Sequence, residues 1–160
     1  MPERKRTILF ICTGNSCRSQ MAEAILRHVA GDKFEALSGG TRPAGVVQPI
    51  AIRALERMGV PTDGLESKHL DQFADCPVNI AITVCDNASA ECPTWLGADI
   101  KVHWGLPDPT FHPGSEEERD AFCTKIAERI RAKVTRLANM RLAECSRDEL
   151  IDKLNSLSAI

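Results

Sequence analysis

The chain has 160 residues, of which 43% are hydrophobic and 26% charged, and its formal net charge is −2 at pH 7. This length and balance indicate one globular domain with a sizeable core. The slight negative charge argues against nucleic acid or an anionic membrane as a partner, and no apolar stretch approaches the length that crosses a bilayer.

Strand-like and helix-like segments alternate along the chain, which is typical of a parallel sheet covered by helices. In chain order, the apolar pattern predicts a strand at 7–12, a helix at 19–30, a strand at 34–38 closed by a turn at Gly39 and Gly40, a helix at 49–58, a short helix at 67–73, and strands at 79–85 and 100–103.

Two capping signatures predict the helices that complete the chain. Ser115 is followed by Glu118 at the spacing of a capping box, and Ser146 is followed by Glu149 in the same way. Each pair precedes an apolar pattern of helical period. With no linker, repeat or low-complexity segment to divide it, the chain is expected to form a single α/β domain over residues 1–160.

The number of cysteines indicates the cellular compartment in which the protein is found. There are seven cysteines, and the short apolar run near the N-terminus is followed by a polar loop instead of a signal-peptide cleavage site. An odd count without a secretory signal argues against a structural disulfide framework. We therefore expect a cytoplasmic protein whose cysteines are core residues, metal ligands or reactive thiols.

A cysteine and an arginine bracket the loop between the first predicted strand and the first predicted helix. Such a loop can point several backbone N–H groups at one centre, and the helix N-terminus adds positive partial charge. Gly14 permits a tightly curved backbone, and Arg18 supplies a planar fork that matches two oxygens of a tetrahedral anion. The same field stabilises a thiolate at Cys12, which makes Cys12 a candidate nucleophile; the alternative is a buried cysteine beside a solvated arginine. The candidate oxyanion-binding residues are Thr13, Gly14, Asn15, Ser16, Cys17, Arg18 and Ser19.

A second loop offers a partner acid. Asp108 lies between Pro107 and Pro109, which stiffen the backbone and hold the carboxylate in a defined direction. It follows the strand predicted at 100–103, so it can reach the same edge of the sheet as Cys12. Asp108 is therefore the candidate general acid, although an ordinary Asp-Pro turn would have the same sequence.

Taken together, these motifs resemble a known family. ICTGNSCRSQMAE (residues 11–23) with the downstream Asp-Pro pair resembles the low-molecular-weight protein tyrosine phosphatase fold, and TVCDNASAEC (83–92) and HWGLPDPT (103–110) make the chain similar to the thioredoxin-coupled arsenate reductases within it. The resemblance covers about residues 7–136. It implies a four-stranded parallel sheet flanked by helices, to which residues 143–160 add a C-terminal helical extension.

The resemblance also implies a reaction. Cys12 would attack arsenate with Asp108 as acid, Cys85 would displace arsenite and form a disulfide with Cys12, and Cys92 would then form a disulfide with Cys85. Thioredoxin or a similar dithiol protein would reduce that last bond, and phosphate or sulfate would compete with arsenate. The function expected is reduction of arsenate to arsenite for arsenic detoxification.

Two other functions are consistent with these residues. The chain could instead be a low-molecular-weight phosphatase that hydrolyses phosphate monoesters, although it has no tyrosine and Thr110 and Phe111 follow the Asp-Pro pair. A non-catalytic anion-binding or metal-binding module is a further alternative. A zinc site would draw on Cys76, Cys85, Cys92 and His103, but the spacings lack a C-x2-C pair.

No tightly bound cofactor is expected, and a potassium ion is the one option considered. Asn15, Glu23 and Ser38 resemble part of a potassium site in related reductases. The sequence departs from that pattern around residues 66–70, where Lys68 offers an ammonium group that could replace the ion.

Overall fold

The computed structural model describes residues 5–85 and 97–160, and these residues form the parallel sheet expected from the sequence. The strands are β1 (Arg6–Cys12), β2 (Phe34–Gly40), β3 (Ile80–Thr83) and β4 (Ile100–His103). Their order across the sheet is β2-β1-β3-β4, and all neighbours run parallel. The predicted four-stranded α/β fold is confirmed.

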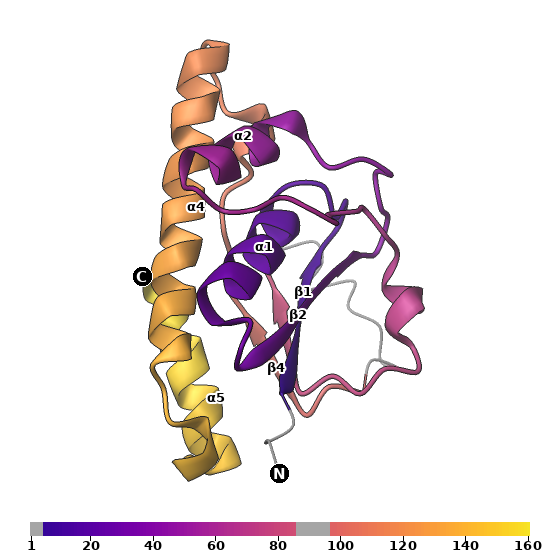
Figure 1. The fold of residues 1–160 in the computed structure, drawn as a ribbon, viewed down its shortest axis with the longest axis vertical. Helices are drawn as coiled ribbons and strands as arrows, with labels where there is room; N and C mark the ends of the chain where they lie inside the picture. Colours follow the sequence, from indigo (N-terminus) through magenta and orange to yellow (C-terminus); the bar gives the residue numbers. More distant parts are fainter. Residues whose placement is uncertain (1–4, 86–96) are drawn as a thin grey trace.

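Four α-helices and four short 3-10 helices surround the sheet in the described residues. The α-helices are α1 (Arg18–Ala30), α2 (Pro49–Arg57), α4 (Glu116–Ala138) and α5 (Arg147–Ser156), and the short helices are η1 (Leu70–Phe73), η2 (Pro109–Phe111), η3 (Leu142–Glu144) and η4 (Leu157–Ala159). Figure 1 shows α4 running the length of one side of the molecule, where it packs against α1 and α2, while α5 packs against β4. None of the helices in the described ranges has the length and apolar character of a bilayer-spanning segment.

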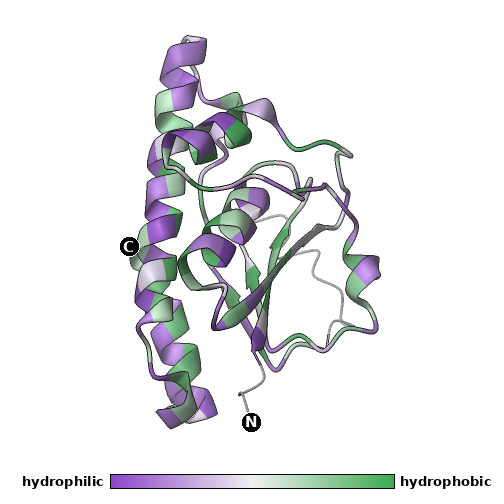
Figure 2. Ribbon diagram, viewed as in Figure 1, coloured by the Kyte–Doolittle hydropathy of each residue, from purple (hydrophilic) through white to green (hydrophobic). Residues whose placement is uncertain are grey.

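The central position of β1 explains its apolar sequence and places the candidate nucleophile. β1 pairs with β2 on one side and β3 on the other, and its residues from Ile8 to Ile11 are fully buried. A parallel strand covered on both faces is apolar throughout, and Figure 2 shows the hydrophobic colour concentrated in the strands. Cys12 therefore lies at the carboxyl end of the innermost strand, where open α/β sheets bind ligands.

The predicted turn at Gly39 and Gly40 is wrong, because both glycines belong to β2. They pair with Ile11 and Cys12 of β1. A Cβ on Gly39 would lie 2.9 Å from a methyl carbon of Leu70. These glycines permit close packing at the end of a strand, which the sequence pattern does not distinguish from a turn.

The helix predicted at 67–73 forms only in its last turn, as η1. The residues before it run beside the end of β2 instead, where the Gly40 amide donates to the Lys68 carbonyl oxygen at 2.9 Å and Gly40 forms an isolated bridge with His69. Backbone pairing with the sheet thus takes the place of the first helical turn.

Two buried side chains attach the C-terminal helices to the rest of the domain. The indole Nε1 of Trp104 donates to the Leu154 carbonyl oxygen at 2.9 Å. Lys133, on α4, donates from Nζ to the carbonyl oxygens of Leu157 at 2.7 Å and Ser158 at 3.1 Å. The last helical turns therefore have their carbonyl groups satisfied by side chains of the core.

Replacing Trp104 by phenylalanine should lower the free energy of unfolding by about 2–4 kcal/mol. The change leaves the Leu154 carbonyl buried without its donor, which costs about 1–3 kcal/mol, and removes part of a fully buried side chain. Urea denaturation followed by circular dichroism measures the loss. Phe111→Leu, at a side chain that is 83% exposed, should change stability by less than about 0.5 kcal/mol; similar values for the two variants would contradict the role of Trp104.

Candidate active site

The loop of residues 13–17, between β1 and α1, is held from outside by a second loop of residues 41–48. Three of its carbonyl groups accept hydrogen bonds from amides of that second loop. The pairs are Arg42 N to Thr13 O (2.9 Å), Ala44 N to Gly14 O (2.8 Å) and Gln48 N to Ser16 O (2.7 Å). Because these carbonyl groups bond outward, the N–H groups of residues 14–17 are left for the concave side, as in an anion-binding nest.

Asn15 fixes the curvature of the loop from behind. It has a φ of 46°, in the left-handed region, and it is fully buried. Its Nδ2 donates to Ser19 Oγ at 2.9 Å and Ser38 Oγ at 3.0 Å, and its Oδ1 accepts from the Lys68 amide at 2.9 Å. Asn15 and Ser19, both predicted to bind the anion, therefore lie behind the loop and shape it.

A cavity of about 490 Å³ opens over the concave side of the loop and gathers most of the predicted site residues. Its lining residues are Cys12, Thr13, Gly14, Ser16, Cys17, Arg18, Gln48, Cys85, Asp108, Thr110 and Phe111. Cys92 lies outside the described residues. Gln48 was not predicted from the sequence, where it gives no signal beyond preceding a helix that begins with proline.

Arg18 links the loop to the predicted acid. Its NH1 donates to the Leu106 carbonyl oxygen at 2.8 Å, and its NH2 lies 3.6 Å from Asp108 Oδ2. The buried Arg18 Nε has no hydrogen-bond partner in the described part of the chain, so a donor is free for an incoming anion. Asp108 is itself oriented, because its Oδ1 accepts from the Thr110 amide at 2.9 Å.

The Cys12 and Cys85 thiols both lie at the cavity, next to Thr13. Both side chains are nearly buried. Thr13 fixes the second sulfur, since its amide donates to Cys85 Sγ at 3.3 Å and its hydroxyl oxygen lies 3.4 Å from the same atom. Two cysteines that lie 73 positions apart in the sequence thus lie at one cavity, with the Cys85 sulfur bonded to the residue next to Cys12.

This arrangement alters the acidity expected of Cys12. The hydrogen bond with Cys85, followed by burial, raises the pKa of the Cys12 thiol, while Arg18 and the Gly14 amide lower it. The sequence predicted a thiolate stabilised by the loop alone. In the anion-free site the neighbouring Cys85 thiol and burial oppose the stabilisation that Arg18 and the loop give to the thiolate.

Replacing Cys85 by alanine should shift the ionisation of Cys12 to lower pH, because it removes the largest cause of the raised pKa. The thiolate is the reactive form, so the rate of Cys12 alkylation by iodoacetamide, followed by peptide mass spectrometry over a pH series, measures the shift. Cys145→Ala, at a thiol remote from Cys12, is the control. An unchanged midpoint in the Cys85→Ala variant would show that Cys85 does not govern Cys12.

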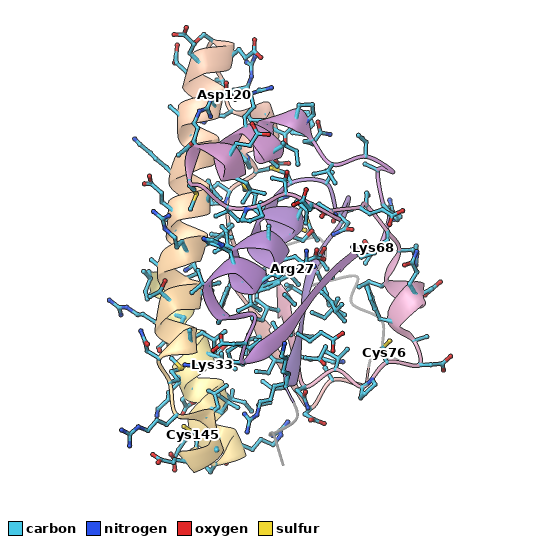
Figure 3. The ribbon with its side chains drawn as sticks, viewed as in Figure 1. Arg27, Lys33, Lys68, Cys76, Asp120 and Cys145 are labelled. Carbon is cyan, nitrogen blue, oxygen red and sulfur yellow. The ribbon has the colours of Figure 1, made fainter. Side chains whose placement is uncertain are left out.

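At the position considered for potassium, the Glu23 carboxylate already lies beside two cationic side chains, Arg27 and Lys68. Glu23 is buried, and its Oε2 accepts from Arg27 NH2 at 2.8 Å. Its Oε1 accepts from Ser38 Oγ at 2.9 Å and lies 3.5 Å from Lys68 Nζ, which also donates to the Glu66 carbonyl oxygen at 2.8 Å. Figure 3 labels Arg27 and Lys68. A further cation would be repelled by both side chains, so these residues do not fit a potassium ion.

We therefore expect that exchanging potassium for sodium in the buffer, at constant ionic strength, will leave the affinity of the cavity for phosphate unchanged. Isothermal titration calorimetry with inorganic phosphate makes this measurement. In a Lys68→Ala variant, by contrast, Glu23 Oε1 loses its ammonium neighbour and keeps only the Ser38 hydroxyl, so the same exchange should then alter affinity. A clear potassium effect on the unmodified protein would contradict this assignment.

The zinc alternative gains no support from the described residues. Among residues 5–85 and 97–160, no three His, Cys, Asp or Glu side chains converge as a metal site. His103 Nδ1 lies 2.7 Å from Thr83 Oγ1, and Cys76 is exposed on the segment after η1. Figure 3 shows Cys76 at the periphery, on the side away from α4.

Comparison with known proteins places this geometry in context. The family of low molecular weight phosphotyrosine protein phosphatases matches residues 7–146. "Arsenate reductase 2" of Staphylococcus epidermidis is 41% identical over 115 residues, which cover 72% of this chain and 87% of that protein. Among solved structures, an arsenate reductase in the phosphate binding state matches with a TM-score of 0.68 and 26% identity, covering 83% of this chain and 96% of the other. A thioredoxin-dependent arsenate reductase of Corynebacterium glutamicum matches with a TM-score of 0.61 and 29% identity, covering 87% and 66%.

Proposed function

This chain belongs to the low molecular weight phosphotyrosine protein phosphatase family, and from that membership and the site geometry we propose that it is an arsenate reductase in which Cys12, Cys85 and Cys92 carry the electrons. The observation that supports this most directly is the placement of both Cys12 and Cys85 at one anion-binding cavity, with the Cys85 sulfur 3.3 Å from the amide of the residue after Cys12. A phosphatase needs one nucleophile there, whereas a reductase needs a second thiol within reach.

In the first step arsenate binds to the backbone amides of the loop between β1 and α1 and to Arg18. The Cys12 sulfur then forms a bond to arsenic, and one arsenic-bound oxygen leaves as water. Asp108 supplies a proton to that oxygen from its position beside Arg18. The proton that the Cys12 thiol gives up passes to the arsenate dianion.

In the second step the Cys85 thiolate attacks the Cys12 sulfur. The sulfur–arsenic bond breaks, and its electron pair stays on arsenic, which passes from the +5 to the +3 state and departs as arsenite. A Cys12–Cys85 disulfide remains. The two sulfurs must approach to about 2 Å to bond, and the contacts of Cys85 Sγ with Thr13, the residue next to Cys12, hold it close by for that approach.

In the third step Cys92 attacks Cys85, which frees Cys12 and leaves a Cys85–Cys92 disulfide for an external dithiol protein to reduce. Cys92 lies outside the described residues, and its role rests on its spacing seven positions after Cys85 and on the family resemblance. We propose thioredoxin as the reductant because a neighbour in structure is named as thioredoxin-dependent. A reducing compartment such as the cytoplasm would keep these thiols ready to react.

A coupled assay tests the proposal. The protein is supplied with arsenate, thioredoxin, thioredoxin reductase and NADPH, and arsenite formed is compared with NADPH oxidised. We expect one arsenite for each NADPH, dependence on thioredoxin, and competition by phosphate. Hydrolysis of p-nitrophenyl phosphate without arsenate-dependent NADPH oxidation would favour the phosphatase, for which the exposed Phe111 at the cavity would be the aromatic contact.

A further inference from the structure

Gln20, in the first turn of α1, is a fully buried polar side chain that takes no part in the proposed chemistry. Its Nε2 lies 2.9 Å from each of three oxygen atoms: the backbone carbonyl oxygen of Asn15, the side-chain Oδ1 of Asn15 and the backbone carbonyl oxygen of Glu66. Among the described residues, the Gln20 Oε1 has no hydrogen-bond partner. The side chain is thus held through its amide nitrogen alone.

The three oxygen atoms determine which chemical group this position accepts. A carbonyl or carboxylate oxygen placed there would face three acceptors, so a donor is required. The positive end of a helix favours a carboxylate in the first turn, yet the first turn of α1 contains no acidic residue. A neutral amide donor thus lies where helix formation alone favours an acid, and the neighbours of Gln20 supply the reason.

Two of the three contacts go to Asn15, the residue that sets the curvature of the anion-binding loop. The φ of Asn15 is 46°, in the left-handed region that costs energy for a residue with a side chain. Hydrogen bonds to its backbone carbonyl and to its side chain together restrict the conformation of this one residue. The third contact extends to the segment 66–68, whose Lys68 amide donates to the same Asn15 Oδ1 at 2.9 Å. Asn15 is therefore held from α1 and from the segment 66–68 at once.

We propose that Gln20 is a positioning residue for the anion-binding loop and acts through Asn15. Without the Gln20 donor, buried carbonyl oxygens of Asn15 and Glu66 lose a partner, which favours relaxation of the left-handed backbone. The amides of residues 14–17 then no longer converge on one centre. Gln20 does not line the cavity, so its effect reaches the anion only through the loop. The proposal rests on the anion-binding part of the proposed function and not on the reduction of arsenate.

The conformation of the loop also affects the ionisation of Cys12. The Gly14 amide is one of the groups that lower the pKa of the Cys12 thiol, and Gly14 directly precedes Asn15 in the chain. A displaced Asn15 moves this amide away from the sulfur, so Cys12 should then ionise at higher pH. This shift is opposite in direction to the one expected for Cys85→Ala, and a purely stabilising role of Gln20 would not cause it.

Gln20→Met tests the proposal, because it replaces the amide by an apolar chain of equal length. We expect inorganic phosphate to bind about 10- to 100-fold more weakly in isothermal titration calorimetry, the loss typical of a hydrogen bond to a charged group. The midpoint of Cys12 alkylation by iodoacetamide should move to higher pH. Met21→Ala is the matched control, since Met21 is the next residue of α1, is fully buried, and has its sulfur 3.8 Å from Cys123 Sγ of α4. It should lower stability, which urea denaturation records, and leave phosphate affinity and the alkylation midpoint unchanged.

Phosphate affinity and an alkylation midpoint that both stay unchanged in Gln20→Met would overturn the proposal, and so would equal changes in Met21→Ala. If Gln20→Met does not fold, which circular dichroism detects, Gln20→Asn gives the same comparison, because its amide is one methylene too short to reach all three oxygens. Alkylation of Cys12 needs neither an anion nor thioredoxin. If the unmodified protein binds no phosphate, the proposed function fails and the alkylation midpoint alone decides the role of Gln20, so the two proposals can fail separately.

Discussion

Replacing Cys85 by serine will abolish catalytic reduction of arsenate, with an expected fall in turnover of roughly 1,000-fold or more, because residues that act as one chemical unit fail together. The hydroxyl group of serine cannot take up the Cys12 sulfur in a disulfide, so the reaction stops at the adduct between Cys12 and arsenic. Arsenite is then not released, and no oxidised dithiol reaches thioredoxin.

The measurement is arsenate-dependent NADPH oxidation, with arsenite quantified in parallel. Cys76→Ser removes an exposed thiol on the segment after η1 and should retain the full rate (Figure 3). Hydrolysis of p-nitrophenyl phosphate provides the internal control. The rate of p-nitrophenyl phosphate hydrolysis should be the same in Cys85→Ser as in the unmodified protein. In Cys12→Ser it should fall to zero. Undiminished arsenate turnover in Cys85→Ser would exclude the cascade.

Adding one methyl group at Gly40 should weaken binding of arsenate and phosphate by about 100-fold, the order of loss that a misplacement near 1 Å causes in an active site. A Cβ on Gly40 would lie 2.6 Å from the Thr13 carbonyl oxygen and 3.0 Å from the Asn15 Cβ. Both neighbours belong to the anion-binding loop, and the nearer is backbone. The loop must therefore shift, and its N–H groups lose their common centre.

Isothermal titration calorimetry of Gly40→Ala with inorganic phosphate measures this loss, and urea denaturation separates it from unfolding. Overpacking of this kind costs about 1–3 kcal/mol of stability, which leaves a typical domain folded. Gly97→Ala is the matched control, because a Cβ there meets no atom within 4 Å among the described residues. Equal phosphate affinity in the two variants would show that the loop tolerates the methyl group.

The elements that the sequence predicted well are those specified by neighbouring residues. The apolar run of β1, the capping box at Ser115 and the second cap at Ser146 each depend on a few consecutive positions, and the structure forms all three. The glycine pair at the end of β2 was wrongly predicted to form a turn, because the reason for glycine at these positions lies in residues that are distant in the sequence. Only the packing of Leu70 on Gly39 and of the anion-binding loop on Gly40 shows why a side chain is excluded.

In the candidate site, too, the features that depend on neighbouring residues could be predicted, and those that depend on distant residues could not. The Cys12–Arg18 motif and Asp108 could be identified from short segments. The pairing of loop 13–17 with loop 41–48 could not, because it consists of backbone hydrogen bonds that any residues can make.

The salt bridge between Lys68 and Glu23 has a consequence for the cell that contains this protein. A charge carried on the polypeptide is present at a fixed local concentration, whatever the surrounding fluid contains, because a tethered group cannot be diluted. Anion binding is therefore expected to be independent of the potassium concentration around the protein. That independence would suit a detoxifying protein, since a cell whose ion pumps are failing is one that needs it working.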